Sequence, residues 1–222
     1  MDTYQKFLKQ FRIKRFKKGE LILVQGEVPT CAHIVKSGVV KAYNLTQAGE
    51  EKPIGFDTEG DLFPIAWVFS KIRSTMYYYE AFTDCEIYCV PLQDYQEFIH
   101  EDVERMTDVY DDFIRKVIGF QMRINALEQS KAHTKIINIL HCLCVNYGVP
   151  QRGDVVKIKL PLTQQDMANF IGLTRETTGI ELKKLQKKGV LTSKKQHYYV
   201  HKDKLNGFLD EDYALVSLTE RM

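Results

Sequence analysis

Eight apolar residues between positions 101 and 128 recur with spacings that alternate between three and four. This is the a/d heptad pattern, which lets two helices wind around each other, and β-branched residues at three of the four a positions favour two parallel helices. Val109, Ile114 and Ile118 widen the apolar face, so we expect the helix to pack on its own domain as well. The other interpretation is a long amphipathic helix that only covers a core in its own chain. The expected dimerisation seam consists of Val103, Met106, Tyr110, Phe113, Val117, Phe120, Ile124 and Leu127.

The chain before this helix alternates short apolar runs with turn residues. Residues 1–18 are basic and carry an apolar stripe with helical spacing, which predicts a helix. Beyond them, glycine-rich turns separate apolar runs at 21–24, 32–35, 39–43, 54–56, 77–82 and 86–90. Runs of this length, bounded in this way, predict the short strands of a small sandwich or barrel.

The chain after the long helix shows a different pattern. Residues 128–131 form a polar break, which we interpret as a hinge, and they are followed by a predicted helix over about 134–147 and a strand over 155–160. Thr163 is an expected N-cap with Asp166 three residues on, close to a capping box. Gly172 marks a turn, and Thr174 is a cap for a second helix over 175–188. Two helices joined by such a turn predict a helix-turn-helix, and the alternating residues 190–200 predict the hairpin of a winged helix.

Composition narrows the class of protein. Hydrophobic residues make up 44% and charged residues 27% of the 222-residue chain, as in ordinary soluble globular proteins. No apolar run approaches the roughly 18 residues of a membrane span, and the N-terminus lacks the apolar stretch of a signal peptide, so we expect a cytoplasmic protein with no membrane partner. The net charge is only +2, yet residues 157–204 hold eleven Lys or Arg against four Asp or Glu, a local charge of +7. Clustered positive charge predicts a polyanionic partner.

The five cysteines form no C-x-x-C pair, which argues against a disulfide framework and against a zinc ribbon. Cys85 and Cys89 are expected on one strand face, and Cys142 and Cys144 lie in one helical region with His141. Buried structural thiols are the favoured interpretation, over a redox or metal site. No metal site and no resident cofactor are therefore expected.

Four motifs in the N-terminal half stand in an informative order. They are GELI at 19–22, QGE at 25–27, IVKSGVVK at 34–41 and EGDLF at 59–63. This ordered set resembles the cyclic-nucleotide-binding β-roll, and the whole chain resembles the Crp/Fnr family of bacterial transcription factors. The resemblance implies an α+β fold with three parts. These are a jelly-roll-like β-roll sensor over 1–100, a dimerisation helix over 101–129 and a winged helix-turn-helix domain over 130–222.

The ligand residues of the family's cyclic AMP-binding members are not matched. Those members carry a Gly-Glu pair after the Gly-Asp turn, where this chain has Pro64 and Ile65, and an Arg-Ser pair where it has Thr75 and Met76. The adenine-reading hydroxyls of the central helix are also replaced here, by Phe120 and Gln121. We therefore expect no cyclic AMP binding. An iron–sulfur cluster is rejected as well, because residues 1–30 contain no cysteine.

Aromatic residues stand where a nucleotide pocket would lie. One interpretation is a pocket for another, flatter or more apolar effector of unknown identity, and the other, slightly favoured, is a space filled by the protein's own side chains. The candidate effector-pocket residues are Phe63, Trp67, Arg73, Tyr77, Tyr79 and Phe120.

Residues 173–179 closely match the recognition helix of the Crp branch of the family. The first residues of such a helix meet base edges, so Arg175 is expected to bond guanine and Glu176 to accept from cytosine. Ile180 stands where the family usually has Arg, and it can touch a thymine methyl group but cannot read guanine. The full set of candidate DNA-contacting residues is Thr163, Gln164, Thr174, Arg175, Glu176, Thr177, Gly179, Ile180, Lys183, Lys194 and Lys195.

The combined features predict a homodimeric regulator that binds palindromic double-stranded DNA, with RNA polymerase as a further partner if it is an activator. The rival hypothesis is a ligand-binding β-roll module that acts on a protein partner, but it leaves the capped helix with Arg175 and Glu176 unexplained. An enzyme is not expected, because the chain shows no nucleophile–base pair, metal-ligand spacing or phosphate loop. Apolar residues in the tail 205–222 have two candidate packing partners, the DNA-binding domain or a second copy.

Overall fold

The computed structural model describes residues 3–209. The described chain divides after Thr107 into two compact units, and each is presented by itself. The predicted tail lies mostly beyond the described residues, so its packing is outside this description. Among residues 3–209, no helix combines the length and the apolarity needed to cross a lipid bilayer.

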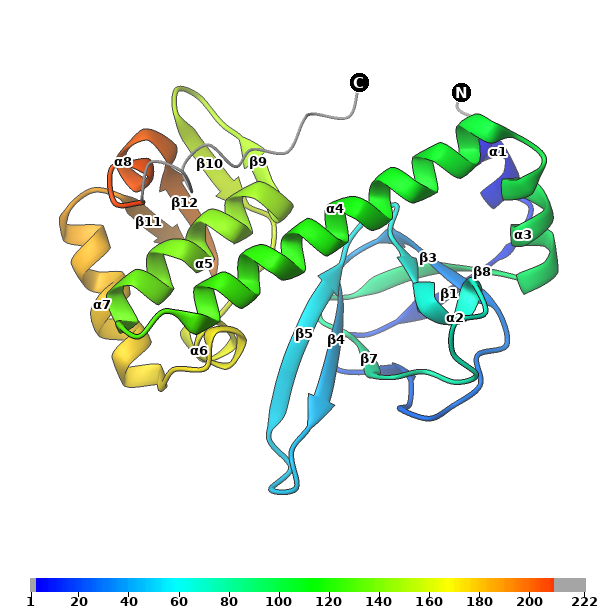
Figure 1. The fold of residues 1–222 in the computed structure, drawn as a ribbon, viewed down its shortest axis with the longest axis horizontal. Coiled ribbons are helices and arrows are strands. Elements are labelled where there is room, and N and C mark those ends of the chain that lie inside the picture. Colours follow the sequence, from blue (N-terminus) through cyan, green and yellow to red (C-terminus); the bar gives the residue numbers. More distant parts are fainter. Residues whose placement is uncertain (1–2, 210–222) are drawn as a thin grey trace. The chain divides into compact units, whose positions relative to one another are not determined.

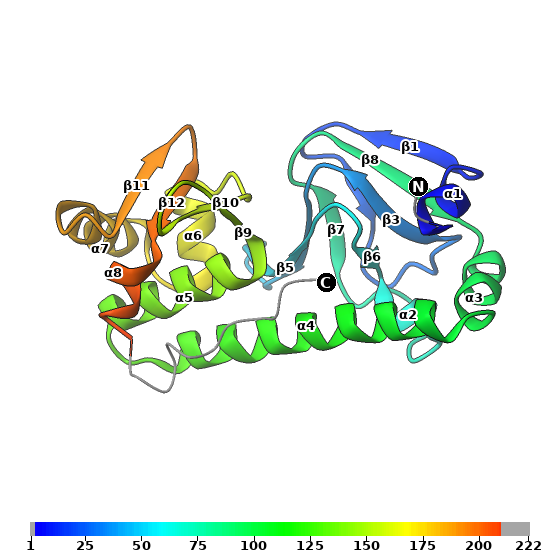
Figure 2. The ribbon, with the colours of Figure 1, turned by 90° about the horizontal axis from the view of Figure 1, so that it is seen from above.

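The first unit contains two four-stranded antiparallel sheets. One has the order β1 (Arg12–Phe16), β8 (Cys85–Val90), β3 (Ala32–Ser37), β6 (Leu62–Phe63), and these strands lie side by side in Figure 2. The other has the order β2 (Leu21–Leu23), β7 (Tyr78–Ala81), β4 (Val40–Leu45), β5 (Glu51–Asp57), and its β4–β5 hairpin is prominent in Figure 1. Short helices α1 (Thr3–Leu8), α2 (Ile65–Val68) and α3 (Leu92–His100) complete the unit.

The core of this unit is shared by the two sheets, which makes it the predicted β-roll. Side chains of β3 and β8 in one sheet meet those of β2, β4 and β7 in the other. The cluster consists of Leu23, Val35, Val40, Ala42, Phe63, Tyr79, Ala81, Cys85 and Ile87. Gly38 is required at the turn between β3 and β4, because its φ is +93° and an added Cβ would collide with the Asp84 carbonyl oxygen.

The prediction of a helix over residues 1–18 is wrong beyond Leu8. After the short α1, residues Arg12–Phe16 form β1, which pairs along its length with β8, from Arg12 opposite Cys89 to Phe16 opposite Cys85. Arg15 also bonds Glu86 of β8 with an Nε–Oε1 distance of 2.7 Å. Backbone pairing with a partner far away in the sequence outweighs local helical spacing here, a competition that spacing alone does not reveal.

A second correction concerns the cysteines. Cys31 and Cys89 form a disulfide across 58 positions of sequence, with their Cα atoms 5.5 Å apart. The interpretation of Cys89 as a structural thiol is therefore wrong, because the register of β3 against β8 places His33 opposite Cys89 and brings Cys31 within reach. Cys85 and Cys142 are buried free thiols, as expected, and burial raises the pKa of Cys142 to about 12.

The long helix α4 spans Val103–Glu128, close to the predicted 101–128. Asp102 sets its start, since its carboxylate accepts a hydrogen bond from the Glu104 backbone N–H at 2.8 Å. Before it, Leu92–His100 form the separate helix α3, which the sequence patterns did not predict.

The second unit holds the greater part of α4 and the C-terminal half of the chain. Its helices are α5 (Ala132–Tyr147), α6 (Gln164–Ile171), α7 (Arg175–Lys187) and α8 (Lys202–Asn206). Its antiparallel sheet has the order β11 (Leu191–Lys194), β12 (His197–His201), β10 (Val155–Ile158), β9 (Gly148–Pro150). Apolar side chains from these elements form the core, among them Ile136, Ile139, Leu140, Leu143, Ile158, Met167, Leu182 and Leu185.

Helix α4 packs on this second core through one narrow face, although Val109, Ile114 and Ile118, from which this packing was predicted, are only half-buried. Met122 and Ala126 are its buried residues. At Gly119 the backbone comes so near to α5 that an added Cβ would lie 2.5 Å from Asn146 Oδ1. Arg123 then reaches α6, where its Nη2 donates to the Phe170 carbonyl oxygen at 3.0 Å and its guanidinium lies 4.1 Å from the Phe170 ring centre.

The predicted seam of α4 is left largely open to solvent. Val103 is 83% exposed, Tyr110 62% and Ile124 55%, and Phe113 and Phe120 are also exposed. Met106, Val117 and Leu127 are half-buried. The seam therefore remains a contiguous apolar row beside, and not within, the face that α4 buries in its own chain.

Candidate nucleic-acid interface

Helix α6 begins at a complete capping box. The Thr163 hydroxyl accepts a hydrogen bond from the Asp166 backbone N–H at 3.1 Å, and the Asp166 carboxylate accepts from the Thr163 backbone N–H at 2.8 Å. The Thr163 hydroxyl also donates to that carboxylate at 2.6 Å. The spacing of Thr163 and Asp166 predicted this arrangement, because each side chain satisfies a backbone N–H that the helix leaves free.

A left-handed turn leads from α6 into α7. Gly172 has φ 67° and ψ 40°, and its N–H donates to the Ala168 carbonyl, which closes the end of α6. Thr174 then caps α7, since its hydroxyl accepts from the Thr177 backbone N–H at 3.1 Å. The predicted helix-turn-helix is confirmed, with α7 ending at Lys187 and Gly189 following at φ +67°.

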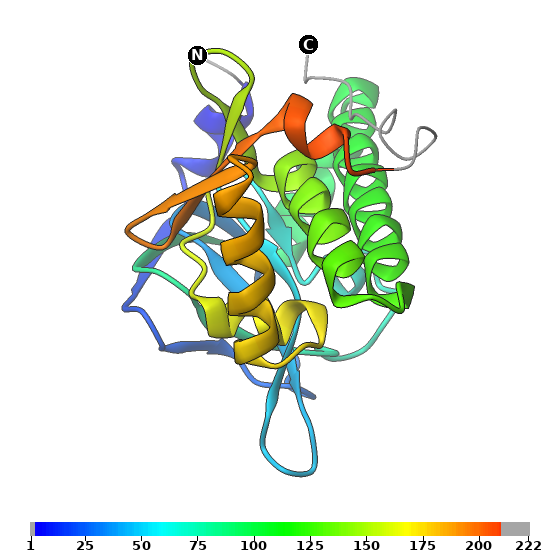
Figure 3. The same ribbon diagram turned by 90° about the vertical axis from the view of Figure 1, so that its left-hand side faces the viewer.

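One face of α7 is buried and the opposite face is free. Thr178, Leu182 and Leu185 point inward and are at most 1% exposed. The outer face carries Glu176, Ile180 and Lys183, all exposed. Figure 3 shows α7 along the surface of the unit with the β11–β12 hairpin beside it.

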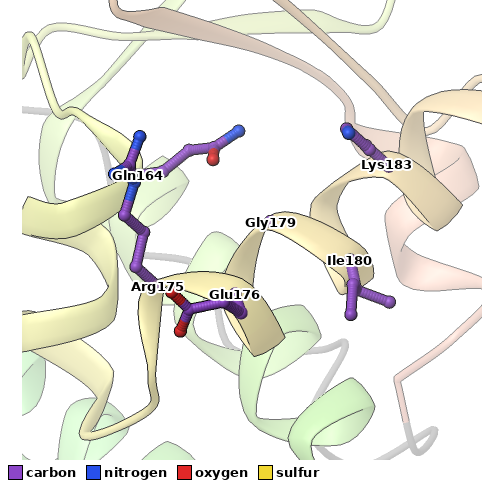
Figure 4. A pocket seen from close by; sticks show the side chains of 6 residues that line it. All are labelled: Gln164, Arg175, Glu176, Gly179, Ile180 and Lys183. Carbon is purple, nitrogen blue, oxygen red and sulfur yellow. The ribbon is translucent and has the colours of Figure 1, made fainter.

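Six residues of α6 and α7 line a surface pocket. They are Gln164, Arg175, Glu176, Gly179, Ile180 and Lys183, all of which the sequence predicted as DNA-contacting residues. In Figure 4 the Gln164 side chain extends above α7, with Arg175 beside it and Ile180 with Lys183 on the next turn. Gly179 makes room for Gln164, because an added Cβ would lie 3.1 Å from its Oε1.

The remaining candidates lie outside this pocket. Thr163, Thr174 and Thr177 form the caps described above. Lys194 and Lys195 are exposed on the hairpin, where Lys195 and Gln196 form a tight turn with φ 48° and 66°. The hairpin is joined to α7 by Gln186, whose Nε2 donates to Ser193 Oγ at 3.1 Å, a contact that no sequence pattern indicated.

Glu181 is an acidic residue of α7 whose burial the sequence patterns did not predict. Its side chain is buried and accepts from Lys184 Nζ at 2.6 Å, and it lies 2.9 Å from His133 Nδ1. The hydrogen bond from Lys184 is the main reason why the pKa of Glu181 lies below its usual range, and His133 adds to the effect. Its negative charge is thus paired on the inner side of α7 and does not add to that of Glu176 on the outer face.

Comparison with known proteins connects this geometry to a family. The family described as "Cyclic nucleotide-binding domain" matches residues 13–102, and "Crp-like helix-turn-helix domain" matches residues 135–205. The "Global nitrogen regulator" of Nostoc sp. is 25% identical over 191 residues, which cover 86% of this chain and 85% of that protein. The "Fumarate and nitrate reduction regulatory protein" of Shigella dysenteriae is 28% identical over 185 residues, covering 82% and 72%. The chain belongs to the Crp/Fnr family.

The fold of this Crp/Fnr regulator agrees with solved structures. The structure of FixK2 from Bradyrhizobium japonicum superposes with a TM-score of 0.73 at 20% identity and covers 89% of this chain and 96% of that one. The α+β architecture of β-roll, long helix and C-terminal helix-turn-helix is thereby confirmed. As a member of this family the protein is a DNA-binding transcriptional regulator and not an enzyme.

The candidate effector residues of this Crp/Fnr regulator have different surroundings. Phe63 and Tyr79 are buried in the core between the sheets, with their ring centres 5.0 Å apart. Trp67 is 9% exposed, Tyr77 packs partly against the core, and Arg73 is exposed. Phe120, the sixth predicted residue, belongs to the second unit. The placement of Phe63 and Tyr79 favours the interpretation that the protein's own side chains fill this space.

Removal of the α6 cap should destabilise the helix-turn-helix. Thr163→Ala deletes the hydroxyl that bonds Asp166, and we expect it to lower the free energy of unfolding by about 1 kcal/mol. Thr163→Ser is the matched control, because it retains the hydroxyl and should stay close to wild type. Urea denaturation followed by circular dichroism measures both, and equal stability of the Ala and Ser variants would contradict the role of the capping box.

Proposed function

We propose that this Crp/Fnr regulator binds palindromic DNA as a homodimer and that its β-roll does not bind cyclic AMP. The observation that carries the DNA-binding mode is the outer face of α7, where Arg175, Glu176 and Ile180 share a pocket with Gln164. The first turn of α7 enters the major groove and presents these side chains to base edges. The rival hypothesis of a β-roll that acts only through a protein partner is disfavoured by the Crp-like helix-turn-helix match over residues 135–205.

Arg175 is the proposed main reader. It is exposed at the first position of α7 and forms no salt bridge with any other described residue, so its guanidinium is available for the O6 and N7 atoms of guanine. Glu176 follows it and accepts from cytosine N4. Ile180 is 55% exposed and offers a thymine methyl group an apolar contact, so the preferred half-site differs at that base pair from one read by Arg.

Other basic residues position the protein on the backbone. Lys183 borders the pocket, and Lys194 and Lys195 lie at the end of the hairpin beside α7. Such side chains contact phosphates and set the register without reading sequence. Two copies related by a two-fold axis then meet two half-sites about one helical turn, roughly 34 Å, apart.

The exposed seam of α4 supports the dimer. An apolar row from Val103 to Ile124 that is open to solvent in one chain gains stability when a second copy covers it. The row has heptad spacing and lies beside the face that packs on α5, so both contacts can form together. RNA polymerase is a further proposed partner if the protein activates transcription.

A nucleotide-binding role of the β-roll is opposed by Thr75. This residue occupies the position of the Arg-Ser pair, is 3% exposed, and its hydroxyl donates to the Val24 carbonyl at 2.6 Å. Its backbone N–H donates to the Glu27 carbonyl at 2.8 Å. Thr75 therefore ties two loops together and offers no positive charge to a cyclic phosphate. No effector or resident cofactor is proposed for the space between the sheets.

A charge on the seam should abolish the dimer. Phe113→Glu places a carboxylate in the middle of the apolar row, where a second copy would have to desolvate it, so we expect a monomer at concentrations where wild type is dimeric. Asp108→Lys is the control, since it changes a charge on the opposite side of α4. Sedimentation equilibrium measures the mass, and a wild-type monomer at micromolar concentration would refute the dimer.

The β-roll should not respond to cyclic AMP. Isothermal titration calorimetry with millimolar nucleotide is expected to give only heats of dilution, because Ile65 and Thr75 stand where the residues that would hold ribose and phosphate are expected. A saturable exotherm with a micromolar constant would show that other residues supply these contacts.

Two variants should distinguish a residue that reads bases from a residue that contacts phosphates. Arg175→Ala removes one bidentate contact per half-site and should cost about 1–3 kcal/mol each, with relaxed preference at that guanine alone. Lys194→Ala should weaken specific and random DNA alike and reduce the salt dependence by about one counterion per contact. Selection from random DNA followed by salt titration measures both. An unchanged sequence preference in Arg175→Ala would refute the placement of α7 in the groove.

A further inference from the structure

Cys31, His33 and Cys89 bring three metal-ligating side chains together in the first unit. One ligand atom from each lies within 4.8 Å of the others. His33 is in β3 directly opposite Cys89 of β8, and Cys31 immediately precedes β3. The two sulfurs form the disulfide described above, so the cluster combines a disulfide and an imidazole.

The imidazole of His33 lacks the hydrogen bonds expected of a buried polar ring. His33 is 2% exposed, and its Nδ1 has no hydrogen-bond partner. Its Nε2 lies 3.6 Å from Cys31 Sγ, and its ring stacks on Phe63 with the centres 5.2 Å apart. The nitrogen that faces Cys31 is Nε2, so an ion held between the ring and the sulfurs would be bound by Nε2, and the unpaired Nδ1 takes no part in that geometry. A sulfur atom is a weak hydrogen-bond acceptor, so a stronger partner for this ring is chemically indicated.

The geometry fits a tetrahedral metal ion. Zinc lies about 2.3 Å from thiolate sulfur and about 2.0–2.1 Å from imidazole nitrogen, which places an S and an N ligand about 3.6 Å apart. The Cys31 Sγ–His33 Nε2 distance already has this value. The two sulfurs need to separate to about 3.8 Å, which requires that the disulfide be broken. Cys89 is only half-buried, so the cluster is open to solvent on one side for the entry of an ion.

We propose that Cys31, His33 and Cys89 form a redox-gated site for zinc, closed when the disulfide is intact and open when it is reduced. In the first step a dithiol reductant gives two electrons and two protons to the disulfide, producing two cysteine thiols and an oxidised, disulfide-bonded reductant. In the second step zinc binds both sulfurs as thiolates, and two protons are released to solvent. His33 supplies the third ligand, and water fills the fourth position.

Zinc is favoured over harder divalent ions because of the donor set. Two thiolates and one imidazole are soft or borderline ligands, whereas magnesium and calcium take oxygen. The site also differs from a purely structural disulfide, because a structural disulfide needs no imidazole beside it and here His33 lies next to Cys31. The expectation that the chain has no metal site is thereby revised for this cluster, on contacts that become visible only after β3 and β8 have paired.

The test uses the full-length protein, reduced with a phosphine and then freed of metal. Zinc is titrated in competition with a chromophoric chelator, and cobalt serves as a spectroscopic probe through its thiolate charge-transfer absorption. We expect one zinc per chain for the reduced protein and none for the oxidised protein. Cys31→Ser and Cys89→Ser should weaken binding by about a hundredfold or more and His33→Gln by about tenfold or more, because losing a direct ligand should cost at least as much as losing an outer-shell partner, about ten- to hundredfold. Cys144→Ser, in the other unit, should match wild type.

A second measurement uses only wild-type protein, so misfolding of a variant cannot affect its result. Reduced wild-type protein is alkylated with iodoacetamide with and without zinc, and mass spectrometry follows each cysteine separately. Zinc should slow the alkylation of Cys31 and Cys89 at least tenfold, because a metal-bound thiolate is a poorer nucleophile, and should leave Cys144 unchanged. Equal alkylation rates of Cys31 and Cys89 in both samples, or zinc binding that survives in Cys31→Ser, would overturn the proposal.

Discussion

The Arg123 guanidinium, on the last turns of α4, contacts the end of α6. The position of α4 relative to the helix-turn-helix depends on this contact. The guanidinium donates to the Phe170 carbonyl, one of the carbonyl groups that the C-terminus of α6 leaves without a helical partner. A positive charge at that end of a helix is favourable, and the Phe170 ring stacks under it. Burial lowers the pKa of Arg123, yet the group remains charged because its ordinary pKa is so high. The part of the seam from Tyr110 to Leu127 and the helix-turn-helix therefore belong to the same compact unit, so the proposed dimer through this part of the seam would also fix where two copies of α7 lie.

The parts of this architecture that could be predicted from sequence are those encoded by neighbouring residues. The capping box of Thr163 and Asp166, the Gly172 turn and the heptad spacing each depend on positions a few residues apart, and the structure has the caps, the turn and a continuous helix over the heptads. What sequence patterns missed depends on strand register. The strand β1, the pairing of Cys31 with Cys89 and the burial of His33 all follow from which residues of β3, β8 and β1 face each other. Register is set by the whole core and is not visible in any short segment.

The second sheet of the β-roll is held in part by polar contacts between side chains of its own strands. Lys41, 7% exposed, forms ion pairs with Glu51 and Glu80, and burial next to these carboxylates raises the pKa of Tyr43 to about 12. Such a pair is costly to bury unless both partners are present, so it specifies how β4, β5 and β7 align. Cys31, His33 and Cys89 belong to the sheet that contains β3 and β8. The ion pairs of Lys41 and the cluster of Cys31, His33 and Cys89 therefore lie in different sheets of the first unit.

In the proposed complex with DNA, affinity and specificity would be carried by different residues of the second unit. The local charge of +7 over residues 157–204 attracts any nucleic acid and supplies binding that weakens with salt. Glu176 works against that attraction, because it brings a negative charge towards the phosphates. Its position limits the cost, since it lies in the first turn of α7, where the helix dipole stabilises a carboxylate. In the groove, a carboxylate accepts from the amino group of cytosine and repels the acceptor atoms of guanine, so the same charge that reduces general affinity enlarges the difference between right and wrong sites. The presence of Glu176 therefore supports the proposal that α7 reads base sequence. A helix that held DNA only by electrostatic attraction would bind DNA more tightly without this negative charge.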